Sequence, residues 1–334
     1  KLASNDRITI SGAGSFSSKA FLLADALRNG TKERFPILWV VNDAAEQEFV
    51  AHACEQWLGI PAVKFEMFEN AHIDRDIAEK NRAAVVLAMK SLIENERVVV
   101  VAPYLHLMQV APEADEIRKK TFKMERGKKM ERIEIFEKLI ELGYEVAQDN
   151  HLESGQYRGD GEVLFVFPIN EDNPIKITFE FDEVQTISFI DQDDGSLIEE
   201  VKKVSMYPLK LSFEKQSFFS ALPSTALFVE DELEVYDEFF DEWEALLKTK
   251  PADIKELTFT AFPEDTGNHL GYRYLSVLKY QDLIDLSLDL LEKARENWRV
   301  VFFTKHAADI KPVLKEKIIV FLENETKFAV AHCR

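Results

Sequence analysis

The feature that most constrains this chain is a stretch of alternating apolar and polar residues in its middle, over residues 143–208. The alternation is clearest at 162–167 and 175–181, and a third run of the same kind covers 184–189. A period of two places one set of side chains in a core and the other in solvent, which is typical of half-buried antiparallel strands. Proline, asparagine and acidic residues separate the first two runs, as in a short turn. The stretch is therefore predicted to form a small antiparallel meander.

The residues before the meander, 8–115, follow a different pattern, in which apolar runs alternate with segments of helical periodicity. The runs at 36–41 (PILWVV) and 97–102 (RVVVVA) are almost continuously apolar, which suits strands buried on both faces of a parallel sheet. Between them, residues 75–95 carry apolar side chains at helical spacing. Because strands that alternate with helices indicate βαβ units, the predicted fold class is α/β with a parallel sheet.

After residue 208 the α/β pattern returns. An apolar segment at 217–229 is followed by an acidic helix, and an amphipathic helix is predicted at 274–295. A strand, a helix at 307–316, a strand at 317–322 and a last strand complete the pattern. The meander is therefore expected to interrupt one sheet-bearing domain in sequence. The predicted domains are 1–115 (first half), 116–208 (a smaller α+β domain with the meander) and 209–334 (second half).

Charge and cysteine content bear on the class of partner. The 334 residues carry a formal net charge of −19, and an acidic surface repels the phosphates that nucleic-acid-binding proteins neutralise with Lys and Arg. Only residues 116–129 are locally basic, and we interpret them as a solvated strand and turn edge. Cys54 and Cys333 lie far apart, and we find neither a membrane-spanning run nor an apolar leader. We expect a cytoplasmic protein that binds neither nucleic acid directly nor membranes.

The segment between the first predicted strand and the first predicted helix has the position of a phosphate-binding loop. A working loop has the pattern G-x-x-x-x-G-K-[ST], with a lysine for the phosphates and a hydroxyl for Mg²⁺. Gly12, Gly14 and Lys19 are present, but Ser17 stands where the second glycine is needed and Ala20 follows the lysine. We interpret the segment as a strand-to-helix turn that has lost nucleotide binding, and we predict no cofactor. An ATP-dependent enzyme with an atypical loop is the alternative.

Acidic residues follow a later apolar run in a pattern that resembles a Walker B strand, whose aspartate would hold Mg²⁺. They are Glu230, Asp231 and Glu232. Because the phosphate-binding loop is degenerate, we interpret them as a helix N-terminus, where carboxylates favour the helix dipole. The seven histidines have no metal-ligand spacing, and no G-x-S-x-G motif occurs. No catalytic residue and no metal site are predicted.

An ordered series of glycines and aromatic residues runs through the meander. It reads Gly-Tyr, then Gly-x-Tyr-x-x-x-Gly, an apolar run that ends in Phe-Pro, and a strand that ends in Phe-Asp-Glu. This series resembles the second domain of bacterial transcription-repair coupling factors, and a homologous domain occurs in UvrB of bacterial excision repair. The residues that carry the resemblance are Gly143, Tyr144, Gly155, Tyr157, Gly161, 163–167, Pro168, Phe181, Asp182 and Glu183.

The resemblance extends at low identity over most of the chain and implies both a fold and a function. It implies a first domain built like a helicase sheet with decayed ATPase motifs, in two halves that flank the second domain in sequence. It also implies a non-catalytic N-terminal module, an adaptor in nucleotide excision repair that docks UvrA and restrains the translocase half. The helicase and RNA-polymerase-binding domains would then belong to a longer chain.

The resemblance also assigns a docking surface. In the family, the contact with UvrA depends on two arginines and a phenylalanine, whose positions fall here on Asp160, Lys176 and Glu180. Lys176 keeps the charge of arginine but loses its bidentate geometry. Asp160 reverses the charge of the other arginine, and Glu180 removes the aromatic ring. The other candidate residues near these positions are Arg158, Phe179 and Phe181. A second hypothesis is therefore an interaction module of the same ancestry that serves another protein partner.

Overall fold

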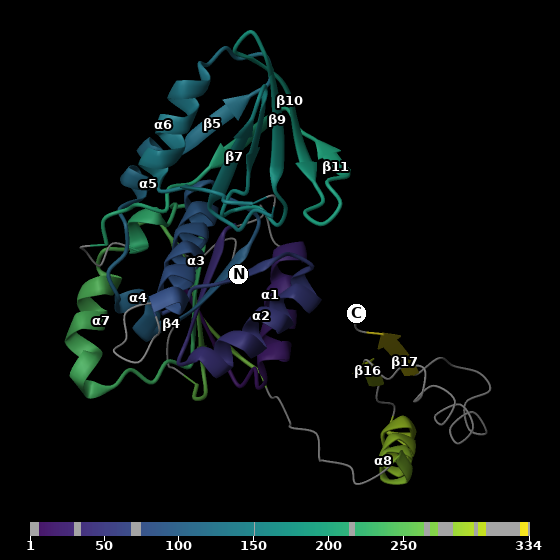
Figure 1. The fold of residues 1–334 in the computed structure, drawn as a ribbon. Coiled ribbons are helices and arrows are strands. Elements are labelled where there is room, and N and C mark those ends of the chain that lie inside the picture. Colours follow the sequence, from purple (N-terminus) through teal and green to yellow (C-terminus); the bar gives the residue numbers. More distant parts are fainter. Residues whose placement is uncertain are drawn as a thin grey trace. The chain divides into compact units, whose positions relative to one another are not determined.

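The computed structural model describes residues 7–29, 35–67, 75–149, 151–213, 218–263, 268–272, 283–296, 300–304 and 328–332. The chain divides into two compact units, residues 1–272 and residues 273–334. The first unit holds a parallel sheet, an antiparallel sheet and a small two-stranded sheet, and Figure 1 labels some of their strands.

The parallel sheet confirms the predicted α/β fold class. Its seven strands follow the order β15-β1-β14-β13-β2-β4-β3, and every neighbouring pair is parallel. Strands β13 to β15 come after the antiparallel part in sequence and pair with strands that precede it. The strands are β1 (Arg7–Ser11), β2 (Ile37–Val41), β3 (Ala62–Lys64), β4 (Val99–Pro103), β13 (Leu227–Asp231), β14 (Lys255–Thr260) and β15 (His269–Gly271).

Helices cover both faces of the parallel sheet (Figure 1). Strand β2 is buried along its whole length because alternate residues enter two different cores: Trp39 packs in one and Leu38 in the other. This explains its continuous apolar sequence. One core includes α1 (Phe16–Asn29) and α2 (Ala44–Leu58). The other includes residues of α3 (Arg75–Ile93), α4 (Tyr104–Met108), η1 (Phe218–Ala221) and α7 (Phe240–Leu247), the last preceded by η2 (Asp237–Phe239).

Local sequence sets the two ends of α2. The side chain of Asp43 accepts hydrogen bonds from the backbone N–H groups of Ala45 and Glu46, which otherwise lack a partner within the helix. Gly59 ends the helix in the left-handed conformation, with φ 66°, as glycines after a helix commonly do. These caps fix where α2 begins and ends, and its apolar residues pack against the sheet and α1.

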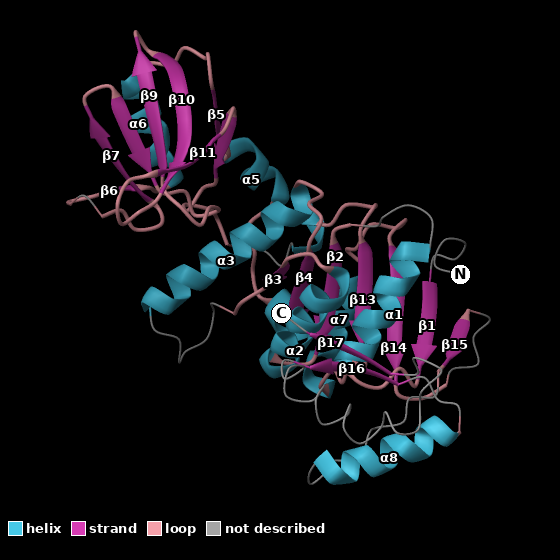
Figure 2. Ribbon diagram, turned by 90° about the vertical axis from the view of Figure 1, so that its right-hand side faces the viewer, coloured by secondary structure: helices cyan, strands magenta, loops and turns pink. Residues whose placement is uncertain are grey.

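The antiparallel part confirms the predicted meander (Figure 2). Its six strands follow the order β11-β10-β9-β8-β7-β6, and all their pairings except β6 with β7 are antiparallel. One face packs on α6 (Arg132–Leu142) and on the two-stranded sheet of β5 (Phe122–Glu125) and β12 (Lys203–Met206). The six strands are β6 (Glu145–Val146), β7 (Gln156–Asp160), β8 (Val163–Val166), β9 (Ile175–Glu180), β10 (Glu183–Ile190) and β11 (Leu197–Glu200).

The basic segment at 116–129 corrects one expectation. It begins as a helix, α5 (Ala114–Lys120), and only then continues into β5, so it is not simply a strand and turn edge. Acidic residues occupy the first turn of α5 and three basic residues occupy its last turn. Both arrangements favour the helix dipole, which accounts for the short helix.

The second unit contains α8 (Leu283–Arg295) and a parallel pair of strands, β16 (Val300–Thr304) and β17 (Phe328–His332). The helix agrees with the described part of the amphipathic segment predicted at 274–295, whose residues 274–282 lie outside the described residues. The helix and the strand predicted at 307–316 and 317–322 lie outside the described residues.

Candidate functional site

The antiparallel sheet has a buried face and an open face. On the open face, Arg158 of β7 lies opposite Phe165 of β8, and Phe165 lies opposite Lys176 of β9. The guanidinium carbon of Arg158 is 5.0 Å from the centre of the Phe165 ring, a cation–π contact. Two cations thus flank one aromatic side chain across three neighbouring strands. We call Arg158, Phe165 and Lys176 the cationic row.

Phe165 is the member of the cationic row that sequence reasoning missed. Its outward direction follows from the period of two, because Leu164 and Val166 on either side of it are buried. Its position between Arg158 and Lys176 depends on the register of three strands, which local pattern does not specify. The structure therefore adds an aromatic side chain between two predicted site residues.

The two acidic positions of the predicted site lie on the same face as the cationic row but outside it. Asp160 is exposed at the end of β7, opposite Val163. Glu180 is exposed at the end of β9, opposite Glu183 of β10. Negative charge therefore borders the cationic row toward the hairpin ends of these strands, and a partner that covers the whole face meets charges of both signs.

The two phenylalanines of the predicted site have opposite environments. Phe179 is 4% exposed and packs in the core on the face that contacts α6, so it supports the sheet and does not belong to the open face. Phe181 is 87% exposed in the two-residue turn between β9 and β10. Phe181 and Asp182 have φ of 49° and 63°, as in the type I′ turns that favour asparagine and glycine. A bulky aromatic residue in this conformation is unfavourable.

Replacement of Phe181 by asparagine is expected to stabilise the protein by about 1 kcal/mol, because asparagine adopts positive φ far more readily. The midpoint of urea unfolding measures the change. Phe262→Asn is the matched control, since Phe262 is also exposed, at 78%, and has no positive φ. A lower midpoint for Phe181→Asn would show instead that the Phe181 side chain stabilises the folded state.

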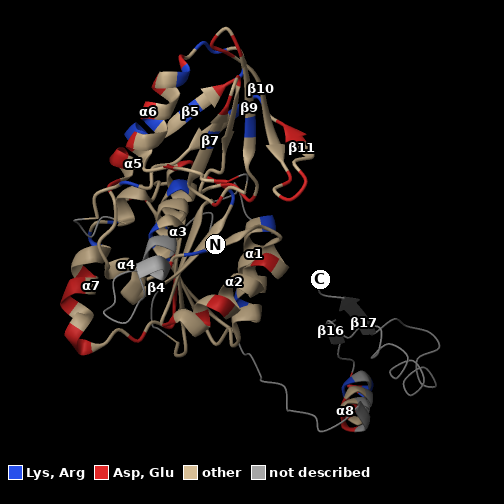
Figure 3. Ribbon diagram, in the orientation of Figure 1, with Lys and Arg blue, Asp and Glu red and all other residues tan. Residues whose placement is uncertain are grey.

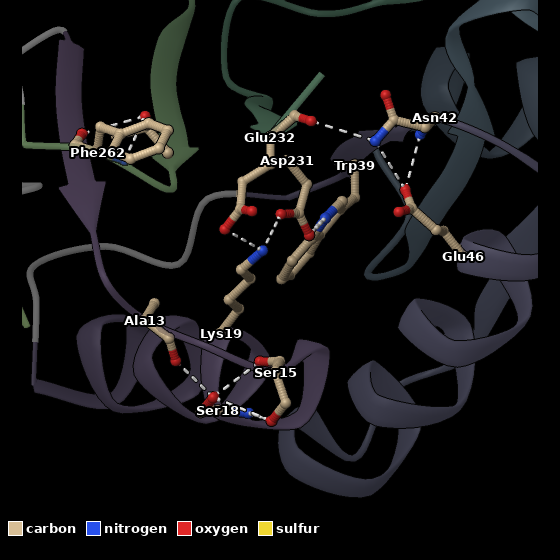
Figure 4. A network of polar contacts seen from close by, with 11 residues as sticks. Ala13, Ser15, Ser18, Lys19, Trp39, Asn42, Glu46, Asp231, Glu232 and Phe262 are labelled. Atoms are coloured by element: carbon tan, nitrogen blue, oxygen red, sulfur yellow. Dashed lines mark hydrogen bonds and ion pairs between the residues drawn. The ribbon is translucent and has the colours of Figure 1, made fainter. Parts of the chain in front are cut away.

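A second group of charged residues lies at the carboxyl end of the parallel sheet (Figure 4). The ammonium of Lys19 is 2.5 Å from Oδ1 of Asp231 and 2.8 Å from Oε1 of Glu232. The indole N–H of Trp39 donates to Oδ2 of Asp231 at 3.0 Å. Lys19 and Asp231 are 3% and 1% exposed, so both charges of this pair are buried and both have partners.

This arrangement corrects the interpretation of residues 230–232 as a helix N-terminus. Asp231 is the last residue of β13, and its carboxylate points at Lys19 of α1. Burial raises the pKa of the Asp231 carboxyl, and the Lys19 ammonium and the Trp39 N–H oppose that rise. Sequence reasoning singled out Lys19 and the acidic residues separately, but the contact between them depends on the strand order.

Another part of the chain, Tyr272, lies against the loop before α1. Gly12 and Gly14 both have positive φ, 65° and 76°. A Cβ at Gly12 would lie 2.2 Å from the carbonyl oxygen of Tyr272, whose N–H donates to Ser11 at 2.8 Å. Tyr272 thus covers the loop at Gly12, and Asp231 and Glu232 engage Lys19.

Within the ranges that the structure describes, no group of three or more His, Cys, Asp and Glu side chains is arranged to hold a metal ion. None of the described helices combines the length and the apolar character needed to cross a membrane.

Comparison with known proteins shows which family the antiparallel part resembles. Residues 122–211 match the UvrB interaction domain family. They span β5 to β12 and thus include the cationic row. This part of the chain is therefore a UvrB-like module.

Curated relatives agree with this match. UvrABC system protein B of Thermus thermophilus is 34% identical over 119 residues, which is 36% of this chain and 18% of the relative. The same protein of Thermotoga neapolitana is 29% identical over 133 residues, or 39% of this chain and 20% of the relative. That of Carboxydothermus hydrogenoformans is 26% identical over 225 residues, or 64% of this chain and 32% of the relative. The chain thus spans between about a fifth and a third of the length of these relatives.

Proposed function

We propose that this chain is a protein-docking module of bacterial nucleotide excision repair, which binds UvrA through the open face of its antiparallel sheet. The observation that carries the proposal is that the match to the UvrB interaction domain falls on the sheet that presents the cationic row. Arginine and aromatic side chains are enriched where proteins bind one another, and charges on such a face steer and orient a partner.

We further propose that the chain is the N-terminal module of a transcription-repair coupling factor. In this proposal residues 1–115 and 209–334 form the two parts of a degenerate helicase-like domain, and residues 116–208 form the docking domain. The ion pair of Lys19 with Asp231 supports a non-catalytic role, because a lysine held in this way is not available to a nucleotide. The translocase and RNA-polymerase-binding domains would lie in a longer chain.

A second candidate is a module of the same ancestry that binds a different protein. Asp160 and Glu180 favour it, because both are exposed carboxylates at positions where the resembled family uses an arginine and a phenylalanine. A surface with this altered charge would fit a partner that has changed in a complementary way.

The experiment that tests the proposed function is a calorimetric titration of this chain with UvrA of the same organism at low and at physiological salt. We expect a dissociation constant in the micromolar range or below, because the cationic row offers the partner both charged groups and an aromatic side chain. The affinity should fall several-fold at the higher salt, because exposed charges are screened. Absence of binding by the folded protein would reject UvrA as the partner and favour the second candidate.

A further inference from the structure

The cationic row continues across the sheet to an acidic end. Lys176 of β9 lies opposite Ser188 of β10, and Ser188 lies opposite Glu200 of β11. One row of directly opposed residues therefore crosses five strands, from two cations on β7 and β9 to a carboxylate on β11. Figure 3 shows the same change of charge, with blue on β9 and red on β11.

The two ends of this row do not neutralise each other. Neighbouring strands are about 4.8 Å apart, so the backbones at Lys176 and Glu200 are separated by about 10 Å. The residue between them, Ser188, has a short side chain and is 7% exposed. Among the described residues, neither Lys176 nor Glu200 forms an ion pair. The sheet thus holds two charges of opposite sign at a fixed spacing, and both can form ion pairs with a partner protein.

Strand β11 has further features of a contact surface. All four of its residues are exposed, and they include Leu197 at 62% and Ile198 at 50%. In the described part of the chain, β11 is an edge strand that pairs only with β10. Apolar side chains that stay exposed beside charged ones are typical of surfaces that proteins cover when they associate.

We propose that β11, with Glu200 as its charged contact, is the second half of the docking site. The inference rests on the proposed function and extends it. The partner would present a carboxylate to the cationic row and an arginine or lysine to Glu200, about 10 Å apart, with an apolar contact for Ile198. A bipolar surface of this kind fixes the orientation of the partner, because rotation by half a turn would place like charges together.

The test is the affinity of Glu200→Lys for UvrA, measured by calorimetry beside Glu199→Lys. Glu199 is the matched control because it lies next to Glu200 on the same strand, is exposed, and points to the other face of the sheet. Both variants change the net charge equally, so any general effect of charge on the affinity is the same. We expect Glu200→Lys to bind at least about tenfold more weakly than Glu199→Lys.

The outcomes separate this inference from the proposed function. Equal affinities for the two β11 variants, together with weaker binding by Lys176→Glu, would overturn the role of β11 and leave the cationic row in place. Wild-type protein that does not bind UvrA would overturn both. Wild-type protein that self-associates through β11, and loses that association in Glu200→Lys, would also overturn the inference, because a second copy of the chain would then be the partner.

Discussion

Replacing Lys19 by methionine is expected to lower the free energy of unfolding by about 3–5 kcal/mol, as is usual when one partner of a buried ion pair is removed. Asp231 now accepts side-chain hydrogen bonds from Lys19 and Trp39. In the variant its carboxylate stays buried and keeps only the bond from Trp39. An uncompensated buried charge disfavours the folded state strongly, whereas the lost contact with the half-exposed Glu232 contributes little.

The double variant Lys19→Met with Asp231→Asn should recover most of this loss. The asparagine is uncharged and its carbonyl oxygen can still accept from Trp39, so the folded state no longer buries an unpaired charge. Urea unfolding of the single and double variants forms a cycle that isolates the coupling between the two sites.

Lys64→Met is the matched control, because its pair with Glu48 is of similar length, 2.6 Å, but exposed. Lys64→Met should lower the free energy of unfolding by less than about 1 kcal/mol. Two results would contradict this prediction. One is that Lys19→Met lowers the free energy of unfolding no more than Lys64→Met does, and the other is that the double variant is no more stable than Lys19→Met.

The pair also connects segments that are distant in sequence. Lys19 and Asp231 are 212 positions apart, on the two sides of the antiparallel part. Lys19 lies on α1, which follows β1, and β1 does not pair with β13, since β14 lies between them. The ion pair therefore closes the carboxyl end of the sheet across strands from both parts of the chain.

Periodicity was sufficient to predict the main elements of the fold. The nearly continuous apolar runs of β2 and β4 indicated strands buried on both faces, and the alternation over 162–189 indicated the meander. It was less informative for short elements. Helix α5 has a favourable distribution of charge but only seven residues, which is too short for a helical period to stand out.

The candidate site was predictable in part. Lys176 and Glu180 follow the outward period of β9, and Phe179 follows the inward period of Ile175 and Ile177. Sequence could thus have placed Phe179 in the core. The neighbours of Lys176 across the sheet could not be predicted, because they depend on register and on a bulge at Gln185 of β10.

Lys176→Glu is expected to cause the largest loss of affinity for UvrA among single changes on the open face, about 30-fold or more, which corresponds to about 2 kcal/mol. The reversal removes a cation from the row and adds a carboxylate to the face that already carries Asp160 and Glu180, so the partner meets an acidic surface where it needs a basic one. The folded state should be unaffected because the side chain is only half-buried on the open face.

The measurement that tests the central claim most directly is the UvrA affinity of Lys176→Glu compared with that of Lys123→Glu. Lys123 is an exposed lysine on β5 in the same UvrB-like module, away from the open face, and its reversal changes the net charge equally. The account predicts that Lys176→Glu weakens binding at least about tenfold more than Lys123→Glu. Equal affinities for the two folded variants would contradict it and would place the docking surface elsewhere on the module.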